Sequence, residues 1–173
     1  MLVTVDDLKS TYGFSVTDKI RGEYEAMLET AEEECLSYAG LEIGELNEYF
    51  EGDGGRILCL THKPIISIDS VTVDGIPSSY RFESRASKLV LSSAAREGAE
   101  IIVTMQLGWK DGKAPSSIRT AIALTVQHLS KLQGAKLMGV LSRTTDGGTE
   151  QIEQSIPPLA VKGLLDRFKS VAM

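Results

Sequence analysis

Apolar residues in the first forty positions recur at three-and-four spacing, which is the pattern of amphipathic helices. Thr4 followed by two aspartates predicts a capped helix start, and Gly13 predicts a left-handed helix end. A second helix is expected from about Thr17 to Gly40. Its apolar stripe consists of Ile20, Tyr24, Met27, Leu28, Ala31, Cys35 and Tyr38. Residues 1–41 are therefore predicted to form an N-terminal helix pair with a strongly acidic solvent side.

The helical pattern is lost over residues 42–55, which are acidic and end in the glycine-rich run from Gly52 to Gly55. This run is superficially similar to part of a calcium-binding loop. It lacks the alternating Asp and Asn ligands and the closing Glu of such loops. We interpret the segment as a connector that ends in a turn, with strands beginning at Arg56.

A period of two is typical of residues 56–108, which are predicted to form a small, mostly antiparallel β-unit. Ile66 and Ile68 share one parity, whereas Val71 and Val73 have the other, so the alternation slips between Asp69 and Ser70. A β-bulge or a strand crossing between two packed surfaces would restore one buried face. The dipeptide Asp74-Gly75 then predicts a hairpin turn.

Helical spacing returns over residues 115–133, where Pro115 suits the first turn of a helix. The main stripe consists of Ile118, Ala121, Ile122, Thr125, Leu129 and Leu132. Ala123, Leu124 and Val126 widen the apolar surface almost all round the middle of this helix. We expect it to be central, enclosed either by other elements of the chain or by neighbouring subunits.

The last part of the chain is predicted to contain a loop and a final helix. Residues 137–155 show no sustained period, and a loop of that length tends to be functional or disordered. A C-terminal helix is expected over 157–171, and it either packs on the core or docks onto a partner. Its stripe consists of Val161, Leu164, Leu165 and Phe168. The predicted fold class is α+β, mainly α: a bundle of about four helices with an inserted antiparallel β-unit.

Charge is distributed unevenly along the 173 residues, although the net charge is only -6. Residues 1–55 carry fourteen acidic side chains against three basic ones, and residues 56–173 carry ten acidic against fifteen basic. The two segments should attract each other, either within one subunit or across a repeated head-to-tail interface between subunits.

Several functional classes are disfavoured by composition. No apolar run approaches the roughly 20 residues of a membrane span, and no export signal is evident, so we expect neither membrane insertion nor secretion. Cys35 and Cys59 are expected to be reduced, buried thiols, and His62 and His128 to be turn or core-edge residues. Carboxylates such as Asp69, Asp74, Glu97 and Glu100 could pair for acid-base catalysis, but no spacing selects a pair. Acidity and the lack of a basic stripe disfavour nucleic-acid recognition.

The order of these parts resembles the phage head-tail connector (head-completion adaptor) family of tailed phages and prophages. The resemblance extends from about Thr4 to Lys169 and depends on packing and turn positions rather than on a catalytic motif. The best-matching residues are Leu58, Leu60, Pro64, Ile66, Ser67, Ile68, Ser70, Val71, Gly108, Trp109, Pro115, Ile118, Ala121, Pro157, Leu164 and Leu165.

This resemblance implies a single connector-like domain, residues 1–173, that acts as a structural virion protein. Its copies would form a ring of about twelve beneath the portal protein, closed by heterologous contacts, and bind the next neck, stopper or tail protein. Genomic DNA would pass through the ring without sequence-specific binding. The implied location is the virion neck, reached from the host cytoplasm during assembly. Neither enzymatic activity nor a cofactor or metal is expected.

The surface expected to contact other subunits or the portal lies in the loop and in the last helix. Its candidate residues are Leu137, Met138, Val140, Leu141, Arg143, Val161, Leu164, Leu165 and Phe168. Binding is expected to order the loop. Two alternatives remain open, namely another neck or tail-completion protein and a generic protein-interaction module.

Overall fold

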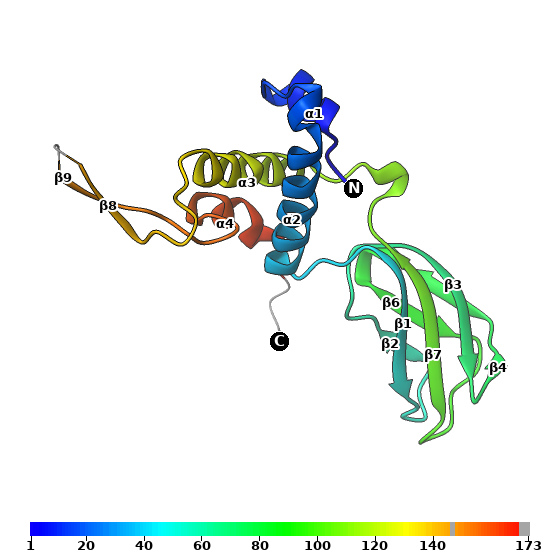
Figure 1. Ribbon diagram of the computed structural model, residues 1–173. Coiled ribbons are helices and arrows are strands. Elements are labelled where there is room, and N and C mark those ends of the chain that lie inside the picture. The colour runs from blue at the N-terminus through cyan, green and yellow to red at the C-terminus, as the bar shows by residue number, and fades with distance from the viewer. Residues whose placement is uncertain (146–147, 170–173) are drawn as a thin grey trace. The chain divides into compact units, whose positions relative to one another are not determined.

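The computed structural model describes residues 1–145 and 148–169, and the chain divides into two compact units (Figure 1). Unit 1 combines Met1–Gly40 with Lys113–Met173, and unit 2 is Leu41–Gly112. The described part of unit 1 contains α1 (Val5–Tyr12), η1 (Asp18–Ile20), α2 (Arg21–Ala39), α3 (Ser116–Gly134), β8 (Ser142–Thr145), β9 (Gly148–Gln151), α4 (Leu159–Leu165) and η4 (Asp166–Phe168). The predicted mixture of helices and antiparallel sheets is confirmed.

Helix α1 begins and ends as the sequence predicts. The Asp7 backbone N–H donates to Thr4 Oγ1 at 3.1 Å, and the Thr4 N–H donates to Asp7 Oδ2 at 2.9 Å, which forms a reciprocal capping box. Gly13 ends the helix with φ 72°, a left-handed conformation that favours glycine. Gly40 ends α2 in the same way with φ 64°.

The apolar stripes of α2 and α3 form the core of unit 1. Leu28, Ala31 and Cys35 of α2 are fully buried, and the Cys35 sulfur lies 3.4 Å from the Thr125 hydroxyl of α3. The buried residues of α3 are Ile118, Ala121, Ile122, Ala123, Thr125, Val126, Leu129 and Leu132. Only Leu124 of its apolar set stays 40% exposed, so this chain's own elements enclose most of the helix.

Unit 2 consists of two antiparallel sheets over one core. The first sheet has the order β1-β7-β3-β4 and the second has β2-β6-β5. The strands are β1 (Gly44–Glu51), β2 (Ile57–Cys59), β3 (Ile65–Val73), β4 (Ile76–Pro77), β5 (Tyr80–Glu83), β6 (Lys88–Leu91) and β7 (Glu100–Leu107). Leu58, Leu89 and Leu91 of the second sheet belong to the same buried cluster as Val103 and Met105 of the first.

The prediction of a connector over residues 42–55 is wrong, because strand β1 (Gly44–Glu51) runs through it and pairs with the whole of β7. Its alternation is obscured by an acid on the buried face. Glu48 is only 8% exposed, and its Oε1 accepts hydrogen bonds from the Thr61 N–H at 3.0 Å and hydroxyl at 2.6 Å. The β-unit therefore begins before the predicted start at Arg56.

The slip in β3 is confirmed, with a second irregularity that the sequence did not reveal. The register against β7 shifts between Ile68 and Ser70, as predicted, and also between Ile65 and Ser67. The extra shift directs Ile65 toward the core and leaves Ile66 45% exposed, so Ile66 and Ile68 do not share a buried face. The hairpin at Asp74-Gly75 joins β3 to β4 with φ 50° and 75° at its two central residues.

Two C-terminal predictions need correction. The expected loop over 137–155 contains the hairpin β8–β9, whose strands are too polar to show a hydrophobic period; residues 146–147 lie outside the described part. The expected helix over 157–171 is shorter, because α4 ends at Leu165 and a 3₁₀ turn follows to Phe168; residues 170–171 are not described.

The two cysteines have different environments. Cys35 is buried as expected, and burial raises the pKa of its thiol to about 11. Cys59 in β2 is exposed, which corrects the expectation of a buried thiol: in a three-residue strand the central Leu58 alone faces the core. His62 lies 3.1 Å from a Glu42 carboxylate oxygen, and His128 is half-buried on α3.

Candidate assembly surface

The segment between α3 and α4, residues 137–145 and 148–156, is called the arm. Its base is closed by one side chain: Gln154 Oε1 accepts from the Gly139 N–H at 2.9 Å. The Gln154 amide nitrogen donates to the carbonyls of Leu137 at 2.9 Å and Val140 at 2.8 Å. The backbone N–H of Ile152 also donates to the Leu141 carbonyl at 3.0 Å. These bonds fix where the hairpin leaves the helices.

The hairpin has two chemically different faces. Arg143 stands opposite Glu150 in the strand register, and the bond between Ile152 and Leu141 extends this register by one pair. Since alternate residues of a strand share a face, Leu141, Arg143, Glu150 and Ile152 lie on one side. The other side is uniformly polar and consists of Ser142, Thr144, Thr149 and Gln151.

The arm extends away from α3 and α4 within unit 1 (Figure 1). Leu141 is 72% exposed and Met138 is 56% exposed, and Arg143 is also exposed. Leu137 and Val140 are half-buried at the base. Five of the predicted interface residues therefore belong to the arm, and three of them are accessible to a partner.

The four candidates in the C-terminal segment are less accessible. Val161 and Leu165 are 2% and 1% exposed, because α4 packs against α3, while Leu164 and Phe168 are half-buried. Tyr38 of α2 holds this segment by donating to Asp166 at 2.8 Å. Helix α4 is thus primarily a part of the core of unit 1.

Glu153 connects the arm to the start of α4. Its carboxylate accepts hydrogen bonds from the Ser155 hydroxyl at 2.6 Å and from the Leu159 backbone N–H. The Ser155 bond and then the Leu159 bond hold the pKa of Glu153 below its usual value, and the nearby His128 and Lys162 act in the same direction. An anion is favourable at this position because the first N–H groups of a helix have no partner within the helix.

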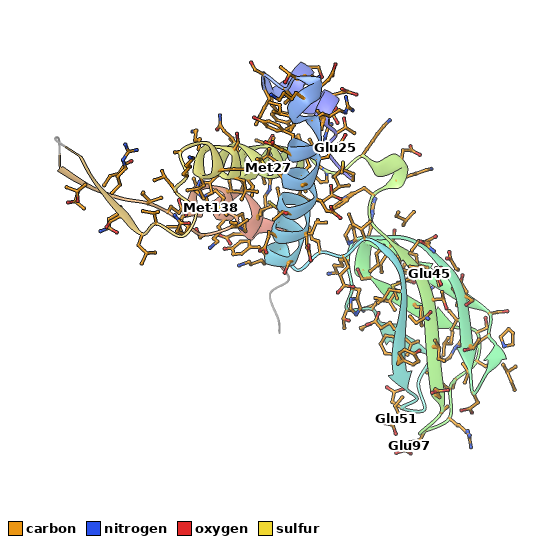
Figure 2. The ribbon with its side chains drawn as sticks, viewed as in Figure 1. Glu25, Met27, Glu45, Glu51, Glu97 and Met138 are labelled. Carbon is orange, nitrogen blue, oxygen red and sulfur yellow. The ribbon has the colours of Figure 1, made fainter. Side chains whose placement is uncertain are left out.

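An apolar groove of about 410 Å³ lies beside the base of the arm. Its lining comes from α2, α3 and the two ends of the arm, and consists of Glu23, Ala26, Met27, Thr30, Leu129, Gln133, Met138 and Ile156. Met27 and Met138, both labelled in Figure 2, contribute from different elements. Met27 belongs to the apolar stripe predicted for α2, yet it lines this groove, and it is only half-buried.

The exposed side of α2 is acidic, whereas residues 113–145, which contain α3 and β8, are basic. Glu23, Glu25, Glu29, Glu33 and Glu34 are all exposed. By contrast, residues 113–145 contain five Lys or Arg residues and no acid. Among the described residues, Glu32 of α2 pairs with the Met1 amine, and Arg21 at the start of α2 pairs with Glu25 and with Asp6. None of these ion pairs involves Lys131, Lys136 or Arg143. Asp7 of α1 does pair with Arg119 of α3 at 3.4 Å, so the predicted attraction acts there within the chain, whereas the exposed carboxylates of α2 do not take part in it among the described residues.

Neither a membrane span nor a metal centre is found among the described residues. None of the helices there has the length and apolarity needed to cross a bilayer. No group of three or more His, Cys, Asp or Glu side chains in the same residues is placed to hold a metal ion.

Comparison with solved structures reveals the fold. A chain in the neck of an empty gene transfer agent (GTA) particle, computed with C6 symmetry, aligns with a TM-score of 0.60 over 97% of this chain and 87% of that one. The chain shares the fold of these neck proteins. The sequences are only 14% identical.

Two further structures agree with this match. The neck of a native GTA particle, computed with C12 symmetry, aligns with a TM-score of 0.57 at 11% identity over 90% of this chain and 86% of that chain. A chain in the virion of a native GTA particle aligns with a TM-score of 0.60 at 13% identity, over 97% of this chain and 87% of that chain. No protein-family model and no curated protein sequence matches the chain. The likeness therefore lies in the fold and not in the sequence.

Proposed function

We propose that this protein is a structural component of the neck of a phage or phage-like particle. Copies would form a ring beneath the portal, extend the DNA channel and connect the head to the tail. The observation that supports this most strongly is the alignment with a GTA neck chain over 97% of the present chain. Both units then act together as one connector-like domain.

A ring of this kind needs two different surfaces on each copy, because heterologous contacts close a cycle by rotation. The arm is the surface that we assign to contacts with other subunits or with the portal. Its exposed residues Met138, Leu141 and Arg143 form the accessible part, and Leu137 and Val140 support the base. The half-buried Leu164 and Phe168 form the second, smaller part at the edge of unit 1.

The remaining partners are the portal protein, the next neck, stopper or tail protein, and the DNA that passes through. The acidic side chains of α2 suit either the channel wall or the outer face of the ring. Acidic groups at a channel wall repel phosphates, whereas basic groups would retain the duplex by releasing its counterions. The function is thus mechanical, and assembly takes place in the host cytoplasm before the neck is complete.

The direct test is reconstitution with tail-less heads or purified portal from the cognate particle. We expect the chain to bind in near-equivalence to portal subunits and to form a ring that negative-stain imaging resolves along the portal axis. A tail-completion protein would bind the opposite end of the neck, and a generic interaction module would bind without rotational symmetry. Either result would contradict the proposal.

The role of the last helix is tested by substitution rather than by truncation. Removing the residues after Ser155 would take Val161 and Leu165 out of the core of unit 1 and expose their contacts. Leu164→Asp and Phe168→Ala change half-buried side chains instead. If the C-terminal edge contacts the portal, these variants should fold and bind portal particles more weakly than the unmodified chain.

A further inference from the structure

The apolar groove beside the arm has no occupant from the described residues of its own chain. Its volume of about 410 Å³ lies within the roughly 300–1,000 Å³ of pockets that bury small ligands, so it can take a few aliphatic side chains. Ala26, Met27, Leu129, Met138 and Ile156 make its lining mainly apolar. Leaving such a surface in water forgoes about 25 cal/mol for each Å² that a partner could bury.

The hairpin of the arm, in turn, has no surface of its own unit to pack against among the described residues. A two-stranded hairpin alone is marginally stable in water, and a surface against which it packs is the usual remedy. The face that carries Leu141 and Arg143 has no described element of unit 1 across from it, and Leu141 is 72% exposed. Because Gln154 fixes the base of the arm, the hairpin is held out from its own helices.

Arg143 of the arm can complement the acidic rim of the groove, although Glu150 stands opposite it on the same face. Glu23 lies at the rim of the groove, on the exposed acidic side of α2. Arg143 follows Leu141 on the same face of the hairpin, so an arm whose Leu141 entered the groove could bring its guanidinium to this rim. Carboxylate and guanidinium groups form strong, geometrically specific pairs.

We propose that the groove receives the arm of the neighbouring copy of this chain in the ring. This inference rests on the proposed function. Leu141 of one copy packs among Ala26, Met27 and Leu129 of the next, and Arg143 pairs with Glu23 there. Such a contact is heterologous, because the arm and the groove are different surfaces, and repetition around an axis closes it into a ring. The Met138 of each copy lines its own groove, so every arm braces the site that its neighbour fills.

A cross-linking experiment tests the pairing. In a background with the exposed Cys59 replaced by Ser, Ala26→Cys and Leu141→Cys are made in separate chains and assembled together on portal-bearing heads. Mild oxidation with oxidised glutathione should give a dimer that contains one chain of each kind. The matched control is Glu25→Cys, also on the exposed part of α2 but outside the groove, which should give no dimer with Leu141→Cys.

A charge exchange provides the second measurement. Glu23→Arg and Arg143→Glu should each lower ring formation on portal particles at least several-fold, and the double variant should restore it. Glu25→Arg should have a much smaller effect, because that residue is not at the rim. Circular dichroism and thermal unfolding of each free variant check that a loss comes from assembly and not from misfolding.

The results separate this inference from the function on which it rests. Rings of unchanged stoichiometry with no cross-link from Ala26→Cys, or a Leu141→Cys chain cross-linked to portal instead, would overturn the arm-in-groove contact and leave the neck role intact. If the unmodified chain forms no ring on portal particles, both the neck role and this contact are overturned.

Discussion

The side-chain amide nitrogen of Gln154 lies 2.8 Å from the carbonyl oxygen of Val140. The Gln154 side chain also hydrogen-bonds to the Leu137 carbonyl and the Gly139 N–H, so this one side chain determines where the arm leaves the helices of unit 1. A polar residue near the end of a segment without hydrophobic period would ordinarily be read as part of a loop. Here it is the residue that makes the segment a defined structure.

Gln154→Ala should therefore loosen the arm without unfolding unit 1. Each neutral hydrogen bond contributes about 0.5–1.5 kcal/mol, and three are lost. Hydrogen exchange should become faster at the amides of Gly139 and Ile152, with little change in α3. Gln151→Ala, on the exposed polar face of β9, is the control. Unchanged exchange at the base would contradict the role given to Gln154.

The core of unit 1 should respond very differently to two neighbouring substitutions in α3. Ile122 is fully buried, so Ile122→Ala should lower the free energy of unfolding of unit 1 by about 2–5 kcal/mol. Leu124 is 40% exposed, so Leu124→Ala should cost less than about 1 kcal/mol. Urea titration followed by circular dichroism measures both. Equal losses would mean that Leu124 is enclosed in the free protein.

Two glycines offer a matched test of close packing. A Cβ at Gly52 would lie 2.3 Å from the Arg96 carbonyl oxygen, so Gly52→Ala must displace backbone and should lower the melting temperature of unit 2. Gly22 in α2 has no atom within 4 Å of that position, so Gly22→Ala should stabilise unit 1 by about 0.5–1 kcal/mol through helix propensity. Differential scanning calorimetry should show a lower melting temperature for Gly52→Ala and a higher one for Gly22→Ala.

The capping box of α1 should make stability depend on pH in the acidic range. The backbone hydrogen bond from Thr4 is the main cause that holds the pKa of Asp7 below its ordinary value, helped by the Thr4 hydroxyl and Arg119 and opposed by partial burial. Since the unfolded chain binds this proton first as pH falls, the stabilisation is present above the ordinary pKa and is lost on acidification through the folded value. As the pH is lowered from 5 to 2, the melting temperature should fall less steeply for Asp7→Asn than for the unmodified chain.

The two thiols should be distinguished by their reactivity. At pH 8 an aromatic disulfide reagent should modify Cys59 rapidly, whereas Cys35 should react only after unfolding, because it is buried and its pKa is raised to about 11. A raised pKa contributes stability below the ordinary thiol pKa that is lost as pH rises toward the folded value. Rapid modification of two thiols in the native protein would contradict the buried position of Cys35.

The sequence by itself determined the elements whose side chains alternate cleanly between core and solvent. The capped α1, the stripes of α2 and α3, the bulge before Ser70 and the hairpin at Asp74-Gly75 all follow from local spacing and turn chemistry. Local physics suffices for these because one face of each element is buried by apolar residues.

Tertiary structure decided the elements whose burial depends on partners far away in the chain. Strand β1 hides its alternation because Glu48 faces inward, and the Thr61 hydroxyl and N–H that donate to its Oε1 lie in another segment. The hairpin of the arm has no apolar period at all, and its base is closed by Gln154 across the hairpin. The groove exists because α2, α3 and the arm converge, so the residues that line it are separated in sequence and share no periodicity. A pattern of single positions can show which face of an element is apolar, but which apolar faces stay uncovered depends on how the elements pack.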